Sequence, residues 1–197
     1  PLAGLVGTHV VQHGKRVAFM AAACGRSLAL EEGERSDLFL AAVLHDCGVS
    51  STRLHQKLID EDLSFEDAHE HAAAGGRLLE RFRPLSRVAR IVRLHHTPWD
   101  SPDRLGTDPR TALLANLVFL CDRVDAHLQS RRGHDALLET DEIRRWVFSR
   151  SGSAFAEEHF AVKKGALFKP VTPELFSDLG DDWKNYDQTY DPKSDLS

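Results

Sequence analysis

Histidine and aspartate residues stand in this 197-residue sequence at positions where a helical pattern calls for an apolar side chain. Between residues 6 and 28, apolar residues recur every three or four positions, and His13 occupies one of the positions that this rhythm assigns to the interior. His9 lies four residues earlier, on the same side of a helix. Four other apolar patterns contain or lead to similar side chains: His45 and Asp46, His71, His95 and His96, and Asp122.

These side chains together predict a metal centre. A single histidine on an apolar face is more often a core residue with satisfied hydrogen bonds than a ligand. Burying several imidazoles and carboxylates without partners, however, costs several kcal/mol for each charged group. A shared cation removes that cost. Neutral imidazole nitrogens and carboxylate oxygens suit Zn, Mn, Fe, Co or Ni, and no cysteine stands beside them at ligand spacing.

The number of candidates favours two ions. Seven residues, with His9 an eighth, exceed the three or four protein ligands that one catalytic ion usually takes. The adjacent pair His45 and Asp46 closes a predicted helix, and a carboxylate placed there can bridge two ions about 3.5 to 4 Å apart. Such a pair allows a bridging hydroxide to attack phosphorus while both ions stabilise the displacement. The predicted chemistry is therefore hydrolysis of a phosphoester.

The elements that position these residues are predicted to be helical throughout, so the fold class is all-α, with the metal centre in the core of a helical bundle. We expect a main domain over residues 1–170 and a helical and polar extension over 171–197. Residues 97–108, rich in proline and aspartate, are a candidate lid. The expected helices cover approximately 5–30, 34–46, 64–82, 84–96, 109–130, 140–149 and 154–166, with a last one beginning near 172.

Composition narrows the classes of function. A net charge of -5 argues against a general nucleic-acid binder, so no DNA partner is expected. No run of about 18 apolar residues is present, so no membrane partner is expected either. Three cysteines without a paired pattern suit a reducing compartment, which predicts a cytoplasmic location. The sequence begins at Pro1 without an initiator methionine, which is consistent with a piece of a longer chain that carries a regulatory domain.

The motif LAAVLHDCG, with a histidine upstream and LVFLCDRVDA downstream, resembles the HD superfamily of metal-dependent phosphohydrolases. The family signature H, HD, D corresponds to His13, His45 with Asp46, and Asp122. HAAAG from His71, the pair His95 and His96, and DRVDA from Asp122 are similar to the HD-GYP subgroup over about residues 9–132. That resemblance implies a cyclic di-GMP phosphodiesterase holding two or three iron or manganese ions, with Zn, Ni, Co and Mg as alternatives.

Several positions depart from the subgroup pattern. Val49 stands where the motif HDxGK has lysine, and the stretch HHExxDGxGYP becomes HHTPWDSPDRLG over residues 95–106. His9 corresponds to an upstream glutamate that binds metal in some members, and it either binds a metal or only borders the site. The candidate metal ligands are kept, whereas the positions that contact substrate in the subgroup differ. This indicates that metal binding is retained and that the contacts to substrate are altered.

The resemblance also implies roles for individual residues. His13, His45, Asp46 and Asp122 would surround one ion, and His71, His95 and His96 would surround the other, with Asp46 shared. His45 and Asp46 are the predicted catalytic residues. Asp125 is expected to hold a histidine N–H or a helix end rather than a metal. Arg104 and Arg131 are candidate phosphate contacts, although a solvated surface position is the alternative for both.

We therefore predict a divergent HD-GYP-type cyclic di-GMP phosphodiesterase that acts on a nucleotide or cyclic dinucleotide with a hydroxide bridging two metals. The alternative is a catalytically impaired HD-type module that signals through partners or binds a nucleotide. A third reading is a one-metal enzyme that turns over only 5'-monophosphates.

Overall fold

The computed structural model describes residues 8–28, 30–49, 65–130 and 136–160. Within these ranges the chain is helical without a β-strand, apart from one isolated bridge between Ser151 and Phe155, which confirms the all-α prediction. The α-helices are α1 (Thr8–Ser27), α2 (Glu32–Leu44), α4 (Phe65–Glu80), α5 (Ser86–Leu94), α6 (Pro109–Ser130) and α7 (Ala136–Phe148). Short 3-10 helices cover Arg83–Leu85, Pro102–Arg104 and Glu157–His159.

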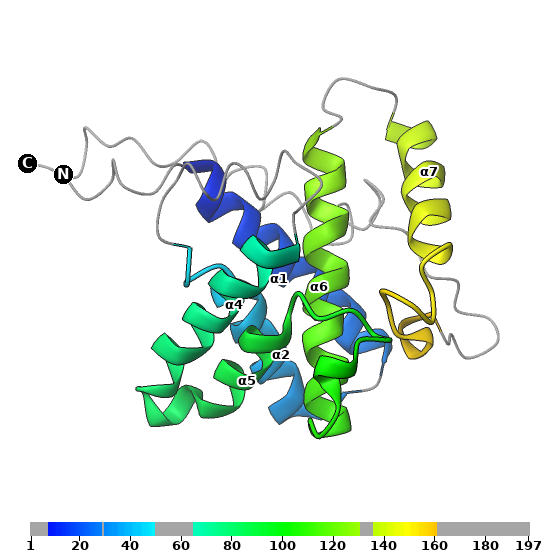
Figure 1. The fold of residues 1–197 in the computed structure, drawn as a ribbon. Helices are drawn as coiled ribbons and strands as arrows, with labels where there is room; N and C mark the ends of the chain where they lie inside the picture. The colour runs from blue at the N-terminus through cyan, green and yellow to red at the C-terminus, as the bar shows by residue number, and fades with distance from the viewer. Residues whose placement is uncertain (1–7, 29, 50–64, 131–135, 161–197) are drawn as a thin grey trace, which may run out of the picture.

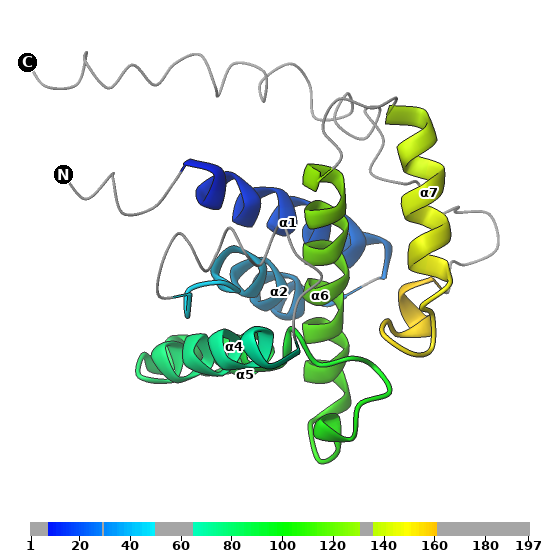
Figure 2. The same ribbon diagram turned by 45° about the horizontal axis from the view of Figure 1, so that its top comes forward.

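The helices pack as two pairs around α6 (Figure 1). α1 pairs with α2, α4 pairs with α5, and α6 contacts α1, α2 and α5. α7 packs against α6, on the side away from α4 and α5 in both ribbon views (Figure 2). This arrangement brings the C-terminal ends of α2 and α5 against the middle of α6.

The apolar stripes of these helices form one core. Val17 of α1, Leu38 of α2, Val92 of α5 and Val118 of α6 are all fully buried within it. Burying a side chain of this size stabilises a fold by about 1.5–3 kcal/mol. The stripes therefore set the rotation of each helix, and the histidines and aspartates that lie on the same stripes must face the interior.

A glycine after α2 allows a close approach to α4. α2 begins with a capping box between Glu31 and Glu34, which starts the helix two residues before the predicted position. After α2 ends, a Cβ atom on Gly48 would overlap the His71 carbonyl oxygen and the Gly75 nitrogen. Only glycine fits there without a shift. Gly48 therefore allows the segment that carries His45 and Asp46 to lie against α4.

The structure corrects the helix predicted over residues 154–166 in its described part, residues 154–160, while residues 161–166 lie outside the described residues. Residues 151–156 form turns and the isolated bridge, and only Glu157–His159 form a 3-10 turn. The reason is tertiary: Asn116 of α6 donates a hydrogen bond to the Ala154 carbonyl at 2.8 Å and accepts one from the Ala156 N–H at 2.8 Å. These two bonds hold the backbone of residues 154–156 in a non-helical conformation.

Other boundaries differ less. α7 begins at 136 rather than near 140, and a 3-10 turn around Pro84 precedes α5. Two backbone hydrogen bonds hold residues 97–108 against the segment that follows α7. The Trp99 N–H donates to the Ala154 carbonyl, and the Asp100 N–H donates to the Ser153 carbonyl. Residue 64, where the predicted helix 64–82 begins, the helix from about 172 and the boundary between 170 and 171 lie outside the described residues. None of the described helices has the length and apolarity needed to cross a membrane.

Candidate metal centre

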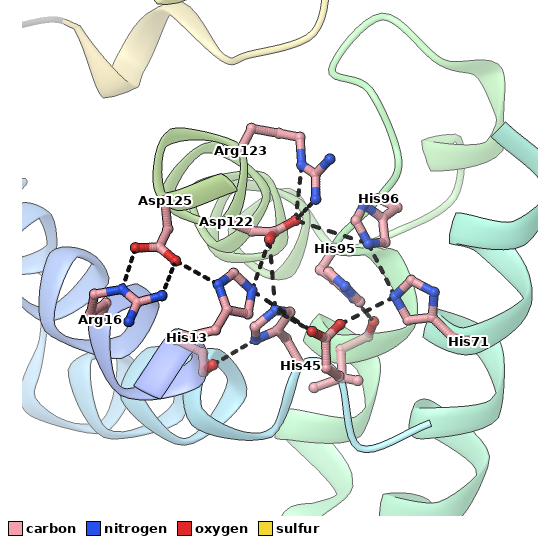
Figure 3. A network of polar contacts seen from close by, with 12 residues as sticks. His13, Arg16, His45, His71, His95, His96, Asp122, Arg123 and Asp125 are labelled. Carbon is pink, nitrogen blue, oxygen red and sulfur yellow. Dashed lines mark hydrogen bonds and ion pairs between the residues drawn. The ribbon is translucent and has the colours of Figure 1, made fainter. Parts of the chain in front are cut away.

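The ends of two helices direct histidines into the site. His45 follows the last residue of α2, and its Nδ1–H donates to the Ala42 carbonyl at 2.8 Å. His95 follows the last residue of α5 in the same way, and its Nδ1–H donates to the Val92 carbonyl at 2.6 Å. Because Nδ1 carries the proton in both rings, Nε2 is left with a lone pair that faces the centre (Figure 3).

The structure brings the seven predicted residues together in two adjacent groups. In each group the potential ligand atoms lie within 4.8 Å of one another. All of these side chains are buried except that of Asp46, which is 15% exposed. The first group contains His13, His45 and Asp122, and the second contains Asp46, His71, His95 and His96.

Asp46 lies between the two groups. Its Oδ2 is 3.2 Å from His45 Nε2 and 3.7 Å from His13 Nε2. Its Oδ1 is 3.4 Å from His71 Nε2. Each carboxylate oxygen therefore faces a different group, which is the arrangement that a carboxylate needs to bridge two cations.

Asp122 directs its two oxygens differently. Oδ1 lies 3.2 Å from His13 Nε2 and 3.8 Å from His45 Nε2. Oδ2 lies 4.0 Å from His96 Nε2 and accepts hydrogen bonds from Arg123 at 2.8 Å and 3.0 Å. One oxygen is thus directed at the first group, while the other is held by an arginine.

The donor set fits metal ions. In the described structure the buried Nε2 atom of His95 makes no hydrogen bond, and a buried polar atom left unpaired costs about 1–3 kcal/mol. The Nε2 atoms of His71 and His96 are 3.1 Å apart, so two ring nitrogens are directed at the same point. A divalent cation would take up these lone pairs, and imidazole with carboxylate is a suitable ligand set for first-row transition metals.

The pKa of His13 in the first group is shifted in the opposite direction from those of His95 and His96 in the second group. Burial alone lowers the pKa of His13, but the carboxylates of Asp122 and Asp125 outweigh it and raise that pKa to about 10. Burial lowers the pKa of His95 to about 3, with help from His45 and His71, and burial also holds the pKa of His96 well below its usual value. His95 and His96 are therefore neutral at pH 7 and ready to bind a metal, whereas His13 must release a proton when it does so.

A carboxylate and an arginine support His13 from behind. Asp125, which is fully buried, accepts a hydrogen bond from His13 Nδ1 at 2.6 Å. Arg16 donates to both oxygens of Asp125, at 2.6 Å and 2.8 Å. The expectation that Asp125 would hold a histidine N–H is confirmed. The sequence reasoning did not identify Arg16 or Arg123, although each is near a candidate ligand in sequence, because charged residues on helices usually face water.

The remaining predicted residues lie elsewhere or cannot be placed. The Arg104 guanidinium stacks on the Trp99 ring at 3.6 Å, and none of its side-chain contacts is with the two groups. Arg131 lies outside the described residues. His9 lies on α1, one turn before His13, but its side chain is not among those described.

Comparison with known proteins gives a consistent result. The HD domain family model matches residues 10–127. The chain is 35% identical to 3'3'-cGAMP-specific phosphodiesterase 1 of Vibrio cholerae serotype O1, over 89% of this chain and 46% of that protein. It is 28% identical to 3'3'-cGAMP-specific phosphodiesterase 3 of the same organism, over 85% and 37%. The chain thus spans less than half the length of these curated relatives, and no solved structure gave a significant match.

Proposed function

The chain belongs to the HD domain family, and on that premise we propose that it is a metal-dependent phosphodiesterase acting on a 3'3'-linked cyclic dinucleotide. The observation that carries this proposal is the position of Asp46, whose two oxygens face two separate groups of histidines. The names of both relatives specify 3'3'-cGAMP, which makes it the first substrate to test. Cyclic di-GMP, the substrate predicted from the resemblance, is the second.

We assign the residues to two ions. His13, His45 and Asp122 would hold one ion, and His71, His95 and His96 would hold the other, with Asp46 shared between them. When bound by these residues, two divalent ions would lower the pKa of water towards neutrality and would stabilise an in-line displacement at phosphorus. Iron or manganese is the proposed metal, and Zn, Ni, Co and Mg are alternatives because the same donors serve several ions.

The protein contributes position and a dry environment. The Nδ1–H bonds of His45 and His95 to main-chain carbonyls fix both rings, so that little reorganisation is needed when a metal binds. The buried histidines keep bulk water away from the centre, while the partly exposed side of Asp46 is where a substrate phosphate can enter. Burial also strengthens every charge interaction within the site.

Product analysis tests the proposal. The purified protein, supplied with Mn²⁺ or with Fe²⁺ under reducing conditions, is incubated with 3'3'-cGAMP, cyclic di-GMP and a 5'-monophosphate, and products are separated by chromatography. We expect linear dinucleotides from at least one cyclic substrate and no free phosphate from the monophosphate. Release of phosphate from the monophosphate alone would instead identify a phosphatase.

A regulatory module without turnover is the second candidate. Val49 in place of the motif lysine and the missing Gly-Tyr-Pro signature favour it. Such a module would bind metal and leave every substrate intact in the same experiment. A cytoplasmic location and a regulatory domain elsewhere in a longer chain stay predictions from the sequence.

A further inference from the structure

We propose that Arg123 is a phosphate-binding residue of this site, whose guanidinium contacts a non-bridging oxygen of the substrate phosphodiester. The inference rests on the proposed function and extends it, because it names the positive side chain that receives the negatively charged group.

Arg123 lies directly against a potential metal ligand. It follows Asp122 on α6, and its Nε and Nη2 atoms both donate to Asp122 Oδ2, at 3.0 Å and 2.8 Å. That oxygen is 4.0 Å from His96 Nε2 of the second group. Figure 3 shows the guanidinium beside Asp122, on the side from which His96 approaches. The positive charge is therefore next to both groups of ligands.

The contacts of Arg123 leave donors for a ligand. A guanidinium has five N–H donors, and the bonds to Asp122 use only Nε and Nη2. Within the described residues, Nη1 makes no hydrogen bond. A phosphate oxygen is well matched to such an edge, since arginine forms short, charge-assisted hydrogen bonds to phosphate.

Arg123 also reaches solvent, unlike the groups that it adjoins. Its side chain is 17% exposed and that of Asp46 is 15% exposed, whereas the side chains of Asp122 and His96 are each 3% exposed. Of these four side chains, Asp46 and Arg123 are the two with access to solvent. The solvent-accessible part of Arg123 can therefore receive an anion beside Asp122.

The other cation near the centre is engaged elsewhere. Arg16 donates to both oxygens of Asp125, which lies behind His13, and it contacts neither Asp46 nor Asp122. The three residues after Asp46, which are Cys47, Gly48 and Val49, carry no positive charge. Among the described residues near the two groups, Arg123 is therefore the cation placed to bind an anion.

Binding of inorganic phosphate tests this role without relying on turnover. Phosphate is titrated into the Mn²⁺-loaded protein by calorimetry, for the wild type, Arg123→Ala, Arg123→Lys and the control Arg144→Ala, an exposed arginine of α7. We expect Arg123→Ala to weaken phosphate binding by about 10- to 100-fold, which is the usual loss for a hydrogen bond to a charged group. Arg123→Lys should lose less, and Arg144→Ala should match the wild type.

Two further measurements separate phosphate binding from support of Asp122. Metal content and thermal unfolding are measured for each variant, and guanidinium ions are added to Arg123→Ala. We expect unchanged metal content and partial recovery of phosphate affinity. Equal phosphate affinity in wild type and Arg123→Ala, including no measurable binding in either, would overturn the proposal. So would a loss of metal in Arg123→Ala that accounts for the loss of phosphate.

These outcomes are distinct from failure of the proposed function. If the wild type binds phosphate through Arg123 but leaves every cyclic dinucleotide intact, the phosphodiesterase proposal fails and the anion site stands. If cyclic dinucleotides are hydrolysed and Arg123→Ala retains wild-type phosphate affinity and kcat/KM, the Arg123 proposal fails alone.

Discussion

Asp125 on α6 accepts a hydrogen bond of 2.6 Å from Nδ1 of His13 on α1, a residue 112 positions earlier in the chain. The bond keeps a proton on Nδ1 and turns Nε2 towards Asp122, 3.2 Å away. His45 and His95 are oriented by main-chain carbonyls instead, so among these three rings only His13 is supported by a carboxylate. A carboxylate partner makes a histidine a stronger metal ligand.

We predict that Asp125→Asn weakens metal binding by about 10- to 100-fold, because the amide is a weaker partner for the His13 N–H and leaves Arg16 without its carboxylate. Metal titration followed by elemental analysis measures this. Asp103→Asn, an exposed acid in the loop before α6, serves as the control. If Asp125→Asn and Asp103→Asn bind metal with the same affinity as the wild type, Asp125 has no influence on the site.

Gly48→Ala is expected to disturb the second group of ligands. A Cβ atom there would overlap the His71 carbonyl oxygen and the Gly75 nitrogen, so the loop that carries Asp46 must move away from α4. The expected cost is about 1–3 kcal/mol of stability, measured by denaturant unfolding, together with a reduced metal content.

The matched control for that substitution is Gly33→Ala. Gly33 lies within α2, and a Cβ atom added there meets nothing within 4 Å. Alanine in a helix is more stable than glycine by roughly 0.5–1 kcal/mol, so this variant should gain stability and keep its metal. Equal behaviour of the two alanine variants would show that the close approach at Gly48 does not position the site.

Acid should destabilise the fold through His159. This residue is buried beside Asn116, and burial lowers its pKa to about 4, whereas the unfolded chain takes up that proton near pH 6.5. The unfolded state therefore binds more protons between these values, and the free energy of unfolding falls as pH is lowered from about 6.5 to 4. The lowered pKa corresponds to at most about 3 kcal/mol.

Denaturant unfolding of metal-free wild type and His159→Gln at pH 7 and pH 5 isolates this contribution. Glutamine can still donate to Asn116 Oδ1 but does not titrate, so the variant should lose less stability on acidification than the wild type. Parallel losses in the two proteins would assign the acid sensitivity to other groups.

The candidate ligands could be predicted from the sequence because burial is periodic. His13 and Asp122 lie on apolar stripes, and a polar residue on such a stripe has no route to water once the helix packs. His45 and His95 were also predictable, since each follows an apolar stripe to the end of its helix. The bridging role of Asp46 was also predicted, but the pattern cannot supply the distances between helices, so the distances from Asp46 to the two groups required the structure.

The missed features depend on contacts between distant segments. Arg16 and Arg123 are charged residues on helices, and sequence alone does not separate a solvated arginine from one held by Asp125 or Asp122. The helix predicted from residue 154 failed for a similar reason. Asn116, about 40 residues earlier, holds the backbone around Ala154 and Ala156 in a turn, and this overrides local helix propensity.

Whether Asp46 is shared by two metal ions is measured by counting the metal bound to Asp46→Ala. Elemental analysis of the metal-loaded wild type should give two equivalents per chain. Asp46→Ala should retain less than one in total, because both groups lose a ligand. His96→Ala, which removes a ligand from the second group alone, should keep about one. Equal metal content in wild type and Asp46→Ala would show that Asp46 is not a shared ligand.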